Sequence, residues 1–290
     1  MIWVYKYGFF NLFLRIKFGL RVKKNKYSLN KEIITETSIS DSSLYSDYPS
    51  LCATAAVNWN VFNEFRTYKE IIEVLDHVTI DQATAYINEI LRNSNWEQEF
   101  TDTLIHTDSL GKPCLYKFKY GTFSPTSVRY LKTFLEIKNL FGNIDGYNIA
   151  EIGVGFGGQA AILVMLSKPN SYTFYDLDSA LNLSEKFMTT LNLNGEFDFQ
   201  DGRNPNSGSN LPDLTISNYA FSELSRNVQD AYLENVILKS PRGYMVWNSL
   251  AEVRLKSYSL ADLIRLIPNS QIIPEIPNTA IGNAIIVWGT

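Results

Sequence analysis

Apolar side chains recur at intervals of three and four residues through the first third of the chain, between residues 53 and 92. This spacing places them on one face of a helix and predicts helices over 53–78 and 82–92. Asp81 stands where the second helix should begin, and an aspartate side chain can cap the free N–H groups of a helix start. We therefore expect the N-terminal third to be mostly helical, and we find no catalytic motif in it.

The pattern changes in the second half of the chain. A helix is expected from Pro125, because Ser124 suits the N-cap position and proline suits the first turn. From residue 147 onward, short apolar runs alternate with amphipathic stretches, which is typical of strands that alternate with helices. The expected strands are 147–152, 171–176, 195–200, 213–218, 243–248, 271–277 and 284–289.

This alternation predicts the α/β fold class, with a doubly wound, Rossmann-like and mostly parallel sheet that carries helices on both faces. No helix separates the last two strands, so we expect them to form an antiparallel terminal hairpin that closes the sheet. The chain is expected to have two parts: a helical N-terminal accessory region over 1–108 and a Rossmann-like catalytic domain over 109–290.

The first strand of the alternating half leads into a glycine-rich turn. Gly153, Gly155 and Gly158 match the G-x-G-x-x-G pattern of dinucleotide-binding domains, and with Gly157 the turn also matches the E-x-G-x-G-x-G pattern of S-adenosylmethionine-dependent methyltransferases. Glycine permits the sharp turn and the close approach of a ligand to the backbone. The helix that follows directs its free N–H groups and its positive dipole end toward the turn. The turn therefore predicts a nucleotide-like cofactor.

Three acidic residues favour S-adenosylmethionine over a nicotinamide dinucleotide. Glu151 lies two residues before the first glycine, where methyltransferases commonly carry an acid that faces the amino-acid end of the cofactor. Asp201 follows the third strand, at the position where methyltransferases hold the adenine amino group of the cofactor. Asp176 ends the second strand and suits the ribose hydroxyls of either ligand, with Asp178 as its alternative and a helix N-cap as its structural role. The terminal hairpin is the layout of class I methyltransferases, which leaves a dehydrogenase as the less favoured class.

Several segments carry a closer likeness to a known family. They are Ser124–Leu131, Glu151–Gln159, Tyr175–Leu177, Ile216–Leu224, Arg242–Tyr244 and Ile286–Gly289. Together they resemble the sugar O-methyltransferases of surface-polysaccharide biosynthesis, over about residues 110–290. The resemblance implies O-methyl transfer from S-adenosylmethionine to a hydroxyl of a sugar or sugar-linked substrate. It also implies cofactor contacts at Gly153, Gly155, Gly157 and Gln159. A methyltransferase for another small molecule or for a lipid remains the alternative.

The residues after the fourth strand are expected to meet the substrate. Methyl transfer to an alcohol is an in-line displacement, and the hydroxyl is a poor nucleophile until its proton leaves. Ser217 and Asn218 end the strand beside the cofactor's sulfonium in this fold, so we expect both to bind the cofactor. Glu223 is the expected general base, with a helix-start or Arg226-pairing role as its structural alternative. Tyr219 is the second expected catalytic residue, by shaping the pocket.

Other polar residues have secondary roles in this hypothesis. Arg129 is expected to pair with the cofactor carboxylate, because a guanidinium group can donate two parallel hydrogen bonds. Tyr120 would cover the same site, and His106 is an alternative base because histidine titrates near neutral pH. Asn248 and Glu275 lie on the rim where the substrate would be recognised.

The composition of the chain limits the kinds of partner and metal that we expect it to bind. The chain has 290 residues and a net charge of −4, which gives no overall reason to expect nucleic-acid binding. The two cysteines, Cys52 and Cys114, form neither a disulfide framework nor a zinc motif and suit a reducing cytoplasm. The two histidines exclude a histidine-rich metal site, and we find no convincing carboxylate cluster. No metal is therefore expected.

The N-terminus is the most basic part of the chain. Residues 1–26 hold seven basic residues, no acidic residue and seven aromatic residues. The longest uncharged run, Tyr7–Leu14, is far shorter than the roughly 20 residues of a membrane span. We favour an accessory helix packed on the protein or on a second subunit of a homo-oligomer. The alternative is peripheral contact with an anionic membrane surface, which would place the cytoplasmic protein at the inner face of the membrane.

Overall fold

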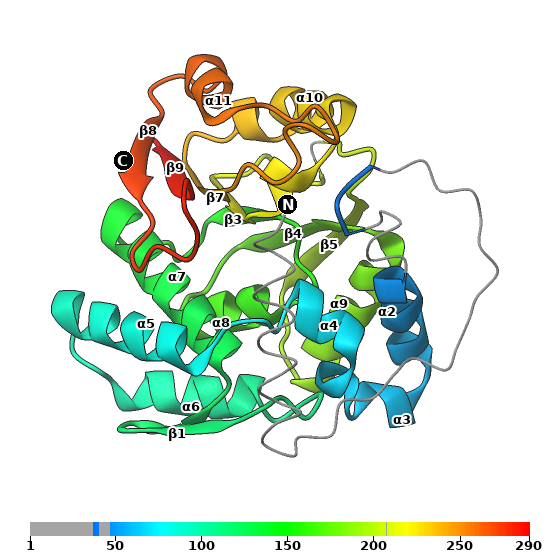
Figure 1. Ribbon diagram of the computed structural model, residues 1–290, viewed down its shortest axis with the longest axis vertical. Helices are drawn as coiled ribbons and strands as arrows, with labels where there is room; N and C mark the ends of the chain where they lie inside the picture. The colour runs from blue at the N-terminus through cyan, green and yellow to red at the C-terminus, as the bar shows by residue number, and fades with distance from the viewer. Residues whose placement is uncertain (1–36, 41–46, 207) are drawn as a thin grey trace.

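A seven-stranded sheet forms the centre of the protein, in the order β5-β4-β3-β6-β7-β9-β8 (Figure 1). The structure is a computed structural model that describes residues 37–40, 47–206 and 208–290, so the expectation for residues 1–26 lies outside the described residues. The strands are β3 (Asn148–Ile152), β4 (Ser171–Asp176), β5 (Glu196–Asp201), β6 (Leu214–Asn218), β7 (Gly243–Trp247), β8 (Gln271–Pro274) and β9 (Ala284–Trp288).

The predicted fold class is confirmed. Strands β5, β4, β3, β6 and β7 pair in parallel. The terminal hairpin is also present, because β8 and β9 pair antiparallel. Strand β9 inserts between β7 and β8 and is antiparallel to both. The carboxyl ends of the five parallel strands therefore meet at one edge, which is where doubly wound folds bind their ligands.

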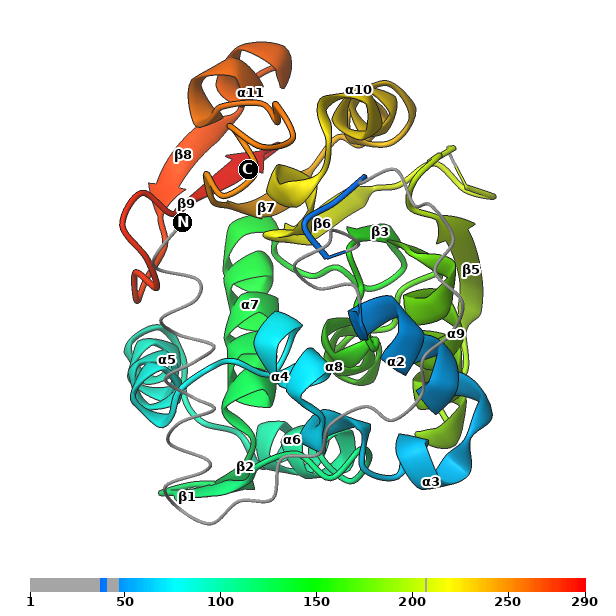
Figure 2. The ribbon, with the colours of Figure 1, turned by 45° about the vertical axis from the view of Figure 1, so that its right-hand side comes forward.

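Helices cover both faces of the sheet (Figure 2). One face carries α10 (Arg226–Asn235) and α11 (Leu260–Leu266), which bury a cluster that includes Tyr232 and Leu263. The opposite face carries α7, α8 and α9, with the N-terminal helices packed outside them. The helices on this side are α2 (Asp47–Val57), α3 (Trp59–Phe62), α4 (Lys69–Val74), α5 (Ile80–Asn93), α6 (Gln98–Thr107), α7 (Pro125–Phe141), α8 (Gly158–Leu166) and α9 (Asp178–Thr190).

Short elements complete the fold. Two small strands form a separate antiparallel hairpin. Helix α5 starts at Ile80 with Thr79 as its N-cap, so the expectation that Asp81 caps it is wrong, and Asp81 lies in the first turn instead. The short elements are β1 (Tyr116–Phe118), β2 (Gly121–Phe123) and the 3₁₀ turns η1 (Phe65–Thr67), η2 (Ala220–Glu223) and η3 (Ile237–Lys239).

The N-terminal helices share a core with the sheet. A single cluster of buried side chains runs from Tyr48 on α2 through Phe134 on α7 to Val287 on β9. The expected division of the chain at residue 108 therefore follows the change from helices to alternating strands and helices. The hydrophobic core continues across it. As a domain boundary it stays a prediction.

Candidate functional site

The glycine turn lies between β3 and α8, at the carboxyl edge of the sheet. Gly153, Gly155 and Gly157 have φ values of 80°, 59° and 87°, which favour glycine. A Cβ atom on Gly153 would lie 2.0 Å from the Cβ atom of Ala220, so η2 also needs a glycine there. The predicted order of strand, tight turn and helix is confirmed.

Asp176 joins the end of β4 to this turn. Its Oδ2 atom accepts a hydrogen bond of 2.8 Å from the Gly155 N–H, and its Oδ1 atom accepts one of 2.7 Å from the Leu177 N–H. Burial raises the pKa of Asp176 to about 6. Each carboxylate oxygen has two lone pairs, so both can still accept a hydrogen bond from a ligand.

A surface ion-pair cluster lies beside Asp176. Asp201 is its neighbour across the β4–β5 register. Arg203 donates to the Oδ1 atom of Asp201 at 3.0 Å and to the Oδ2 atom of Asp178 at 3.1 Å. Asp178 therefore points toward Arg203, whereas Asp176 points toward the glycine turn. As adenine and ribose contacts, Asp201 and Asp176 remain predictions.

Glu151 has a different environment from the other acids. It lies on the sheet face toward α7 and α8, is 1% exposed, and accepts a 2.5 Å hydrogen bond from the Tyr172 hydroxyl. Burial raises the pKa of Glu151 to about 8. Its carboxyl group thus already has a hydrogen-bond partner in the protein, on the helix-covered face of the sheet. The contact of Glu151 with a cofactor stays a prediction.

The end of β6 is fixed from two sides. The buried Ser217 hydroxyl donates to the Ile152 carbonyl at 3.2 Å and accepts from the Phe221 N–H at 3.0 Å, so it joins β3 to η2. The Asn218 amide donates to Gln159 Oε1 at 3.4 Å. Gln159 in turn donates to the Tyr130 carbonyl at 3.1 Å. Ser217 therefore has a structural role here, while Asn218 and Gln159 link β6, α8 and α7.

A small polar pocket opens next to Asn218. It has a volume of about 20 Å³ and is lined by Tyr86 from α5, Arg129 and Lys132 from α7, Tyr219 and Glu275. The Nε atom of Arg129 is buried and has no hydrogen-bond partner among the described residues. Lys132, by contrast, forms a 2.5 Å ion pair with Glu136. The Nε atom of Arg129 is thus a free hydrogen-bond donor in this pocket, which we name the Arg129 pocket.

Tyr219 and Glu275 form one wall of the Arg129 pocket. The Tyr219 hydroxyl donates to Glu275 and also contacts the Thr279 hydroxyl at 3.0 Å. Tyr219 has a φ of 69°, an uncommon conformation for a bulky residue that is often found at functional sites. Glu275 was expected only on the rim, and the structure brings it into direct contact with Tyr219.

Glu223 is the last residue of η2. Its Oε1 atom accepts a 2.7 Å hydrogen bond from the Asn248 amide, and burial raises the pKa of Glu223 to about 7. Residues 37–40 cross this segment, because the Ile39 N–H donates to the Glu223 carbonyl at 3.1 Å and the Ser225 N–H donates to the Thr37 carbonyl at 2.8 Å. A carboxylate that titrates near neutral pH suits proton transfer.

The remaining candidates lie against other elements. Tyr120 stacks on Trp96, with ring centroids 4.6 Å apart. His106 contacts the Leu191 carbonyl at 3.0 Å. The structure therefore does not bring these two side chains to the Arg129 pocket. Sequence reasoning missed Tyr86 and Lys132, because on helices α5 and α7 their spacing is that of ordinary packed or surface positions.

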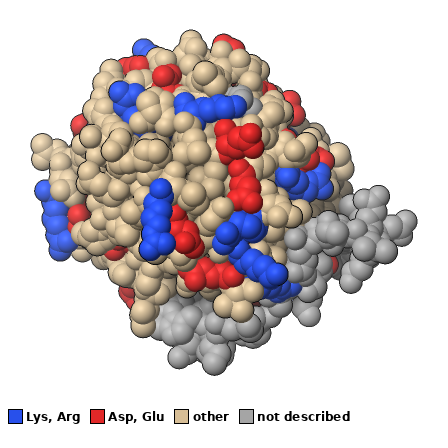
Figure 3. Space-filling model, turned by 90° about the horizontal axis from the view of Figure 1, so that it is seen from above, with Lys and Arg blue, Asp and Glu red and all other residues tan. Residues whose placement is uncertain are grey.

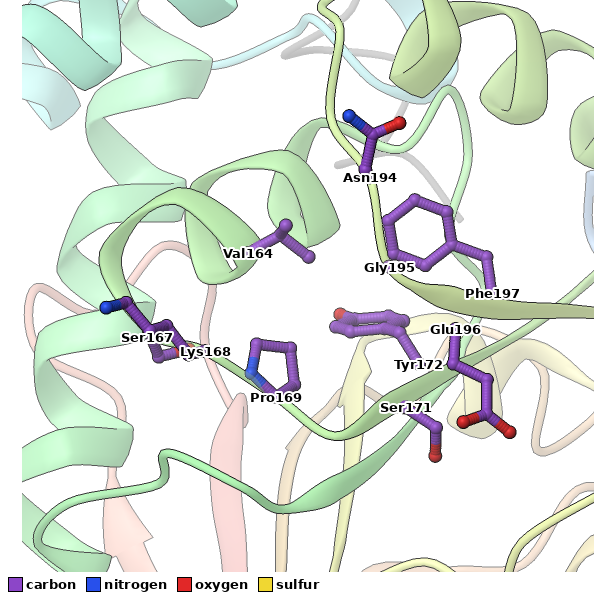
Figure 4. A pocket seen from close by; sticks show the side chains of 10 residues that line it. All are labelled: Val164, Ser167, Lys168, Pro169, Ser171, Tyr172, Asn194, Gly195, Glu196 and Phe197. Atoms are coloured by element: carbon purple, nitrogen blue, oxygen red, sulfur yellow. The ribbon is translucent and has the colours of Figure 1, made fainter.

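A larger cavity lies at the opposite edge of the sheet. It has a volume of about 160 Å³ and is bounded by Val164, Pro169, Tyr172 and Phe197 (Figure 4). Its walls are the end of α8, the segment that follows it and the amino ends of β4 and β5, away from the glycine turn. Although this cavity is larger than the Arg129 pocket, we do not take it as the candidate site, because doubly wound sheets bind ligands at their carboxyl ends.

The described residues offer neither a metal-binding cluster nor a membrane-spanning helix. Over residues 37–40, 47–206 and 208–290, no group of three or more histidine, cysteine, aspartate or glutamate side chains is placed to hold a metal ion. Within the same residues, every helix is too short or too polar to span a lipid bilayer.

Several solved structures have a distant likeness to this chain. No family model and no curated protein matches the chain. Among solved structures, a Thermoplasma acidophilum protein is 19% identical with a TM-score of 0.41, covering 65% of this chain and 95% of its own. A SAM-dependent methyltransferase from Aquifex aeolicus is 15% identical with a TM-score of 0.39, covering 53% of this chain and 87% of its own. TrmK of M. capricolum, solved with S-adenosylhomocysteine, is 17% identical with a TM-score of 0.38, covering 53% and 66%. Likenesses this weak carry no argument about ligand or substrate.

Proposed function

We propose that the protein is an S-adenosylmethionine-dependent O-methyltransferase that acts on a hydroxyl of a sugar or sugar-linked substrate. The observation that carries the proposal is the glycine turn bonded to Asp176 at the carboxyl edge of a parallel sheet closed by an antiparallel hairpin. A nicotinamide dehydrogenase shares the turn but not the hairpin. A methyltransferase for another small molecule or lipid stays the alternative, because the acceptor is inferred from family resemblance alone.

The residues present fit this cofactor. The Gly155 N–H holds Asp176 in place, and Asp176 keeps lone pairs for a ribose diol. The unpartnered Nε atom of Arg129 offers a donor for the carboxylate of the amino-acid end. Asn218 lies between these two positions, and Asp201 lies at the far end of the edge. In this assignment Glu151 supports the site from beneath the sheet.

The proposed chemistry needs a positioned hydroxyl and a proton acceptor. S-adenosylmethionine supplies an electrophilic methyl group on a sulfonium. Glu223 would accept the proton of the acceptor hydroxyl, and its pKa of about 7 leaves much of it ionised at neutral pH. Tyr219 shapes the pocket and holds the acceptor in place. The proposal needs no metal ion.

Charge supports a small-molecule acceptor rather than a nucleic acid. Lysine and arginine side chains are interspersed with aspartate and glutamate on the face in Figure 3, without a continuous basic surface there. Nucleic-acid binding depends on neutralising many phosphates. Cytoplasmic location, a homo-oligomer and membrane contact through residues 1–26 remain parts of the hypothesis.

Ligand binding tests the cofactor assignment. We expect S-adenosylhomocysteine to raise the melting temperature and NAD to leave it unchanged, because a ligand at 100 times its Kd adds about 2.7 kcal/mol to the stability. Stabilisation by NAD alone would make the dehydrogenase the correct class. Release of S-adenosylhomocysteine in the presence of a panel of sugars, nucleotide sugars and lipids would then identify the acceptor.

Asp176 provides a pH-dependent test. Asp176→Asn should weaken S-adenosylhomocysteine binding about tenfold or more, whereas Asp178→Asn should leave it nearly unchanged. The wild-type affinity should fall as the pH drops below about 6, because the carboxylate that accepts the diol becomes protonated. Calorimetry at pH 5 and 7.5 measures this, and equal affinities in Asp176→Asn and wild type would move the ribose contact elsewhere.

A further inference from the structure

The loop that joins β8 to β9 is attached to the protein in an unusual way. Between residues 275 and 283, Glu275 alone is buried, while Ile276 is 41% exposed and Ile281 is 90% exposed. Loops are ordinarily anchored by buried apolar side chains. Here the anchor is a carboxylate, so hydrogen bonds hold the loop in place.

Protein groups saturate the Glu275 carboxylate. It accepts from the Tyr219 hydroxyl, from the Thr279 N–H at 2.9 Å, from the Thr279 hydroxyl at 2.8 Å, and from the Asn283 amide at 3.2 Å. A carboxylate offers about four acceptor positions, and four donors fill them. Among the described residues, Tyr219 is the one donor that does not belong to the loop.

The backbone fixes the position of Tyr219. Its N–H donates to the Val246 carbonyl at 2.9 Å, and its carbonyl accepts from the Ser222 hydroxyl at 2.6 Å. With its left-handed φ of 69°, these bonds tie Tyr219 to β7 and η2. The backbone of Tyr219 is therefore held independently of its side-chain contact with Glu275.

The Arg129 pocket is too small for a ligand while this contact is closed. Its volume of about 20 Å³ is enough for one water molecule and too little for an amino-acid group. The contact between Glu275 and Tyr219 forms one of its walls. Glu275 begins the loop 275–283, in which no apolar side chain is buried.

We propose that Glu275 and Tyr219 form a latch that closes the loop 275–283 over the Arg129 pocket, and that the amino-acid end of the cofactor reaches Arg129 when the latch opens. This inference rests on the proposed function for its ligand. Glu275 is then a positioning residue that controls access and does not touch the reacting atoms.

Two ligands separate the latch from the rest of the cofactor site. S-adenosylhomocysteine carries the amino-acid end, and 5′-methylthioadenosine lacks it. Stopped-flow measurements should show S-adenosylhomocysteine associating about tenfold faster with Tyr219→Phe than with wild type, because a hydrogen bond to a charged group is lost. Association of 5′-methylthioadenosine should be equal in both proteins. Equal rates for S-adenosylhomocysteine would overturn the inference.

Hydrogen exchange tests the latch without a ligand. In Tyr219→Phe and Glu275→Gln, the amides of residues 276–283 should exchange about tenfold faster than in wild type. Tyr258→Phe is the matched control, because its hydroxyl donates to Asp230 at 2.7 Å in a different part of the protein. Unchanged exchange in both latch variants would show that other contacts hold the loop.

The two hypotheses fail in different ways. If S-adenosylhomocysteine does not bind wild type, the proposed function is wrong, and the exchange experiment still decides whether the latch exists. If S-adenosylhomocysteine binds wild type, but associates with Tyr219→Phe at the same rate, only the inference about the latch is wrong. Should Glu275→Gln not fold, Thr279→Val removes one hydroxyl donor from the same carboxylate and should raise exchange in the loop.

Discussion

A carboxyl group inside an apolar layer has a cost that depends on pH. Glu151 is packed between the sheet and α7–α8, with the Tyr172 hydroxyl as its hydrogen-bond donor. Burial raises its pKa to about 8, so at neutral pH the folded protein holds a proton that the unfolded chain has released. Stability is therefore greatest below the pKa of the unfolded chain and falls as the pH rises toward 8.

Glu151→Gln should remove this dependence. Glutamine does not titrate, so the variant should gain stability relative to wild type between about pH 5 and 8, by up to about 1.4 kcal/mol per pH unit. Urea unfolding at pH 5, 6.5 and 8 measures the difference. The exposed Glu234→Gln is the control and should follow wild type at each pH. A pH-independent difference for Glu151→Gln would mean that Glu151 is ionised in the folded protein.

At the scale of elements, a buried arginine joins the N-terminal helices to the glycine turn. The Arg66 guanidinium donates to both carboxylate oxygens of Asp76, at 2.9 and 3.0 Å, and to Asp108 at 2.9 Å. Asp108 also accepts from Ser124, the N-cap of α7. The guanidinium lies 4.9 Å from the ring centroid of Phe156 in the glycine turn. This network thereby fixes the start of α7, the helix that carries Arg129.

Arg66→Met should be strongly destabilising. Removing the guanidinium leaves Asp76 and Asp108 buried without their cation, and breaking a buried pair in this way typically costs about 3–5 kcal/mol. Arg92→Met is the matched control, because its pair with Glu89 is exposed and should contribute about 1 kcal/mol or less. Urea denaturation measures both. A loss for Arg66→Met as small as that of the control would mean that these carboxylates become solvated.

Local signals predicted most of the elements. Ser124 and Pro125 mark the start of α7, and the glycine pattern marks the turn, because capping and backbone freedom depend on a few adjacent residues. The terminal hairpin followed from the missing helix between β8 and β9. Thr79 was missed as a cap because Thr79 and Asp81 are both good capping residues, and the capping box with Gln82 decides between them.

The contacts within the site could not be predicted in the same way. Tyr219 and Glu275 are 56 residues apart, and Arg66 and Asp108 are 42 residues apart. Neither pair has a periodic or local signature, because the pairing depends on which loops the finished sheet brings together. Glu151 shows the same limit: its position in the motif gives no sign that its carboxyl group accepts a hydrogen bond from Tyr172 on the next strand.

At the scale of the whole molecule, the N-terminal helices and the sheet form one packed body. Phe65 from η1 contacts both Phe156 of the glycine turn and Phe187 of α9, with ring centroids 5.3 and 6.2 Å apart. Lys186 of α9 donates to the Ala55 carbonyl at 3.0 Å, which fastens α2 to the sheet layer. Apolar packing and polar bonds thus both cross the change in sequence pattern near residue 108.

We therefore expect residues 47–107 and the sheet to unfold in a single transition. If the helices formed a separate unit, they would lose structure at a different denaturant concentration. Pulsed hydrogen exchange with mass spectrometry, across a urea gradient, reports the folded fraction of each segment separately. Peptides from 48–107 and from 148–176 should lose protection at the same urea concentration. Earlier loss in the N-terminal peptides would establish a domain boundary near residue 108, and Arg66 would then stabilise an interface between domains rather than a common core.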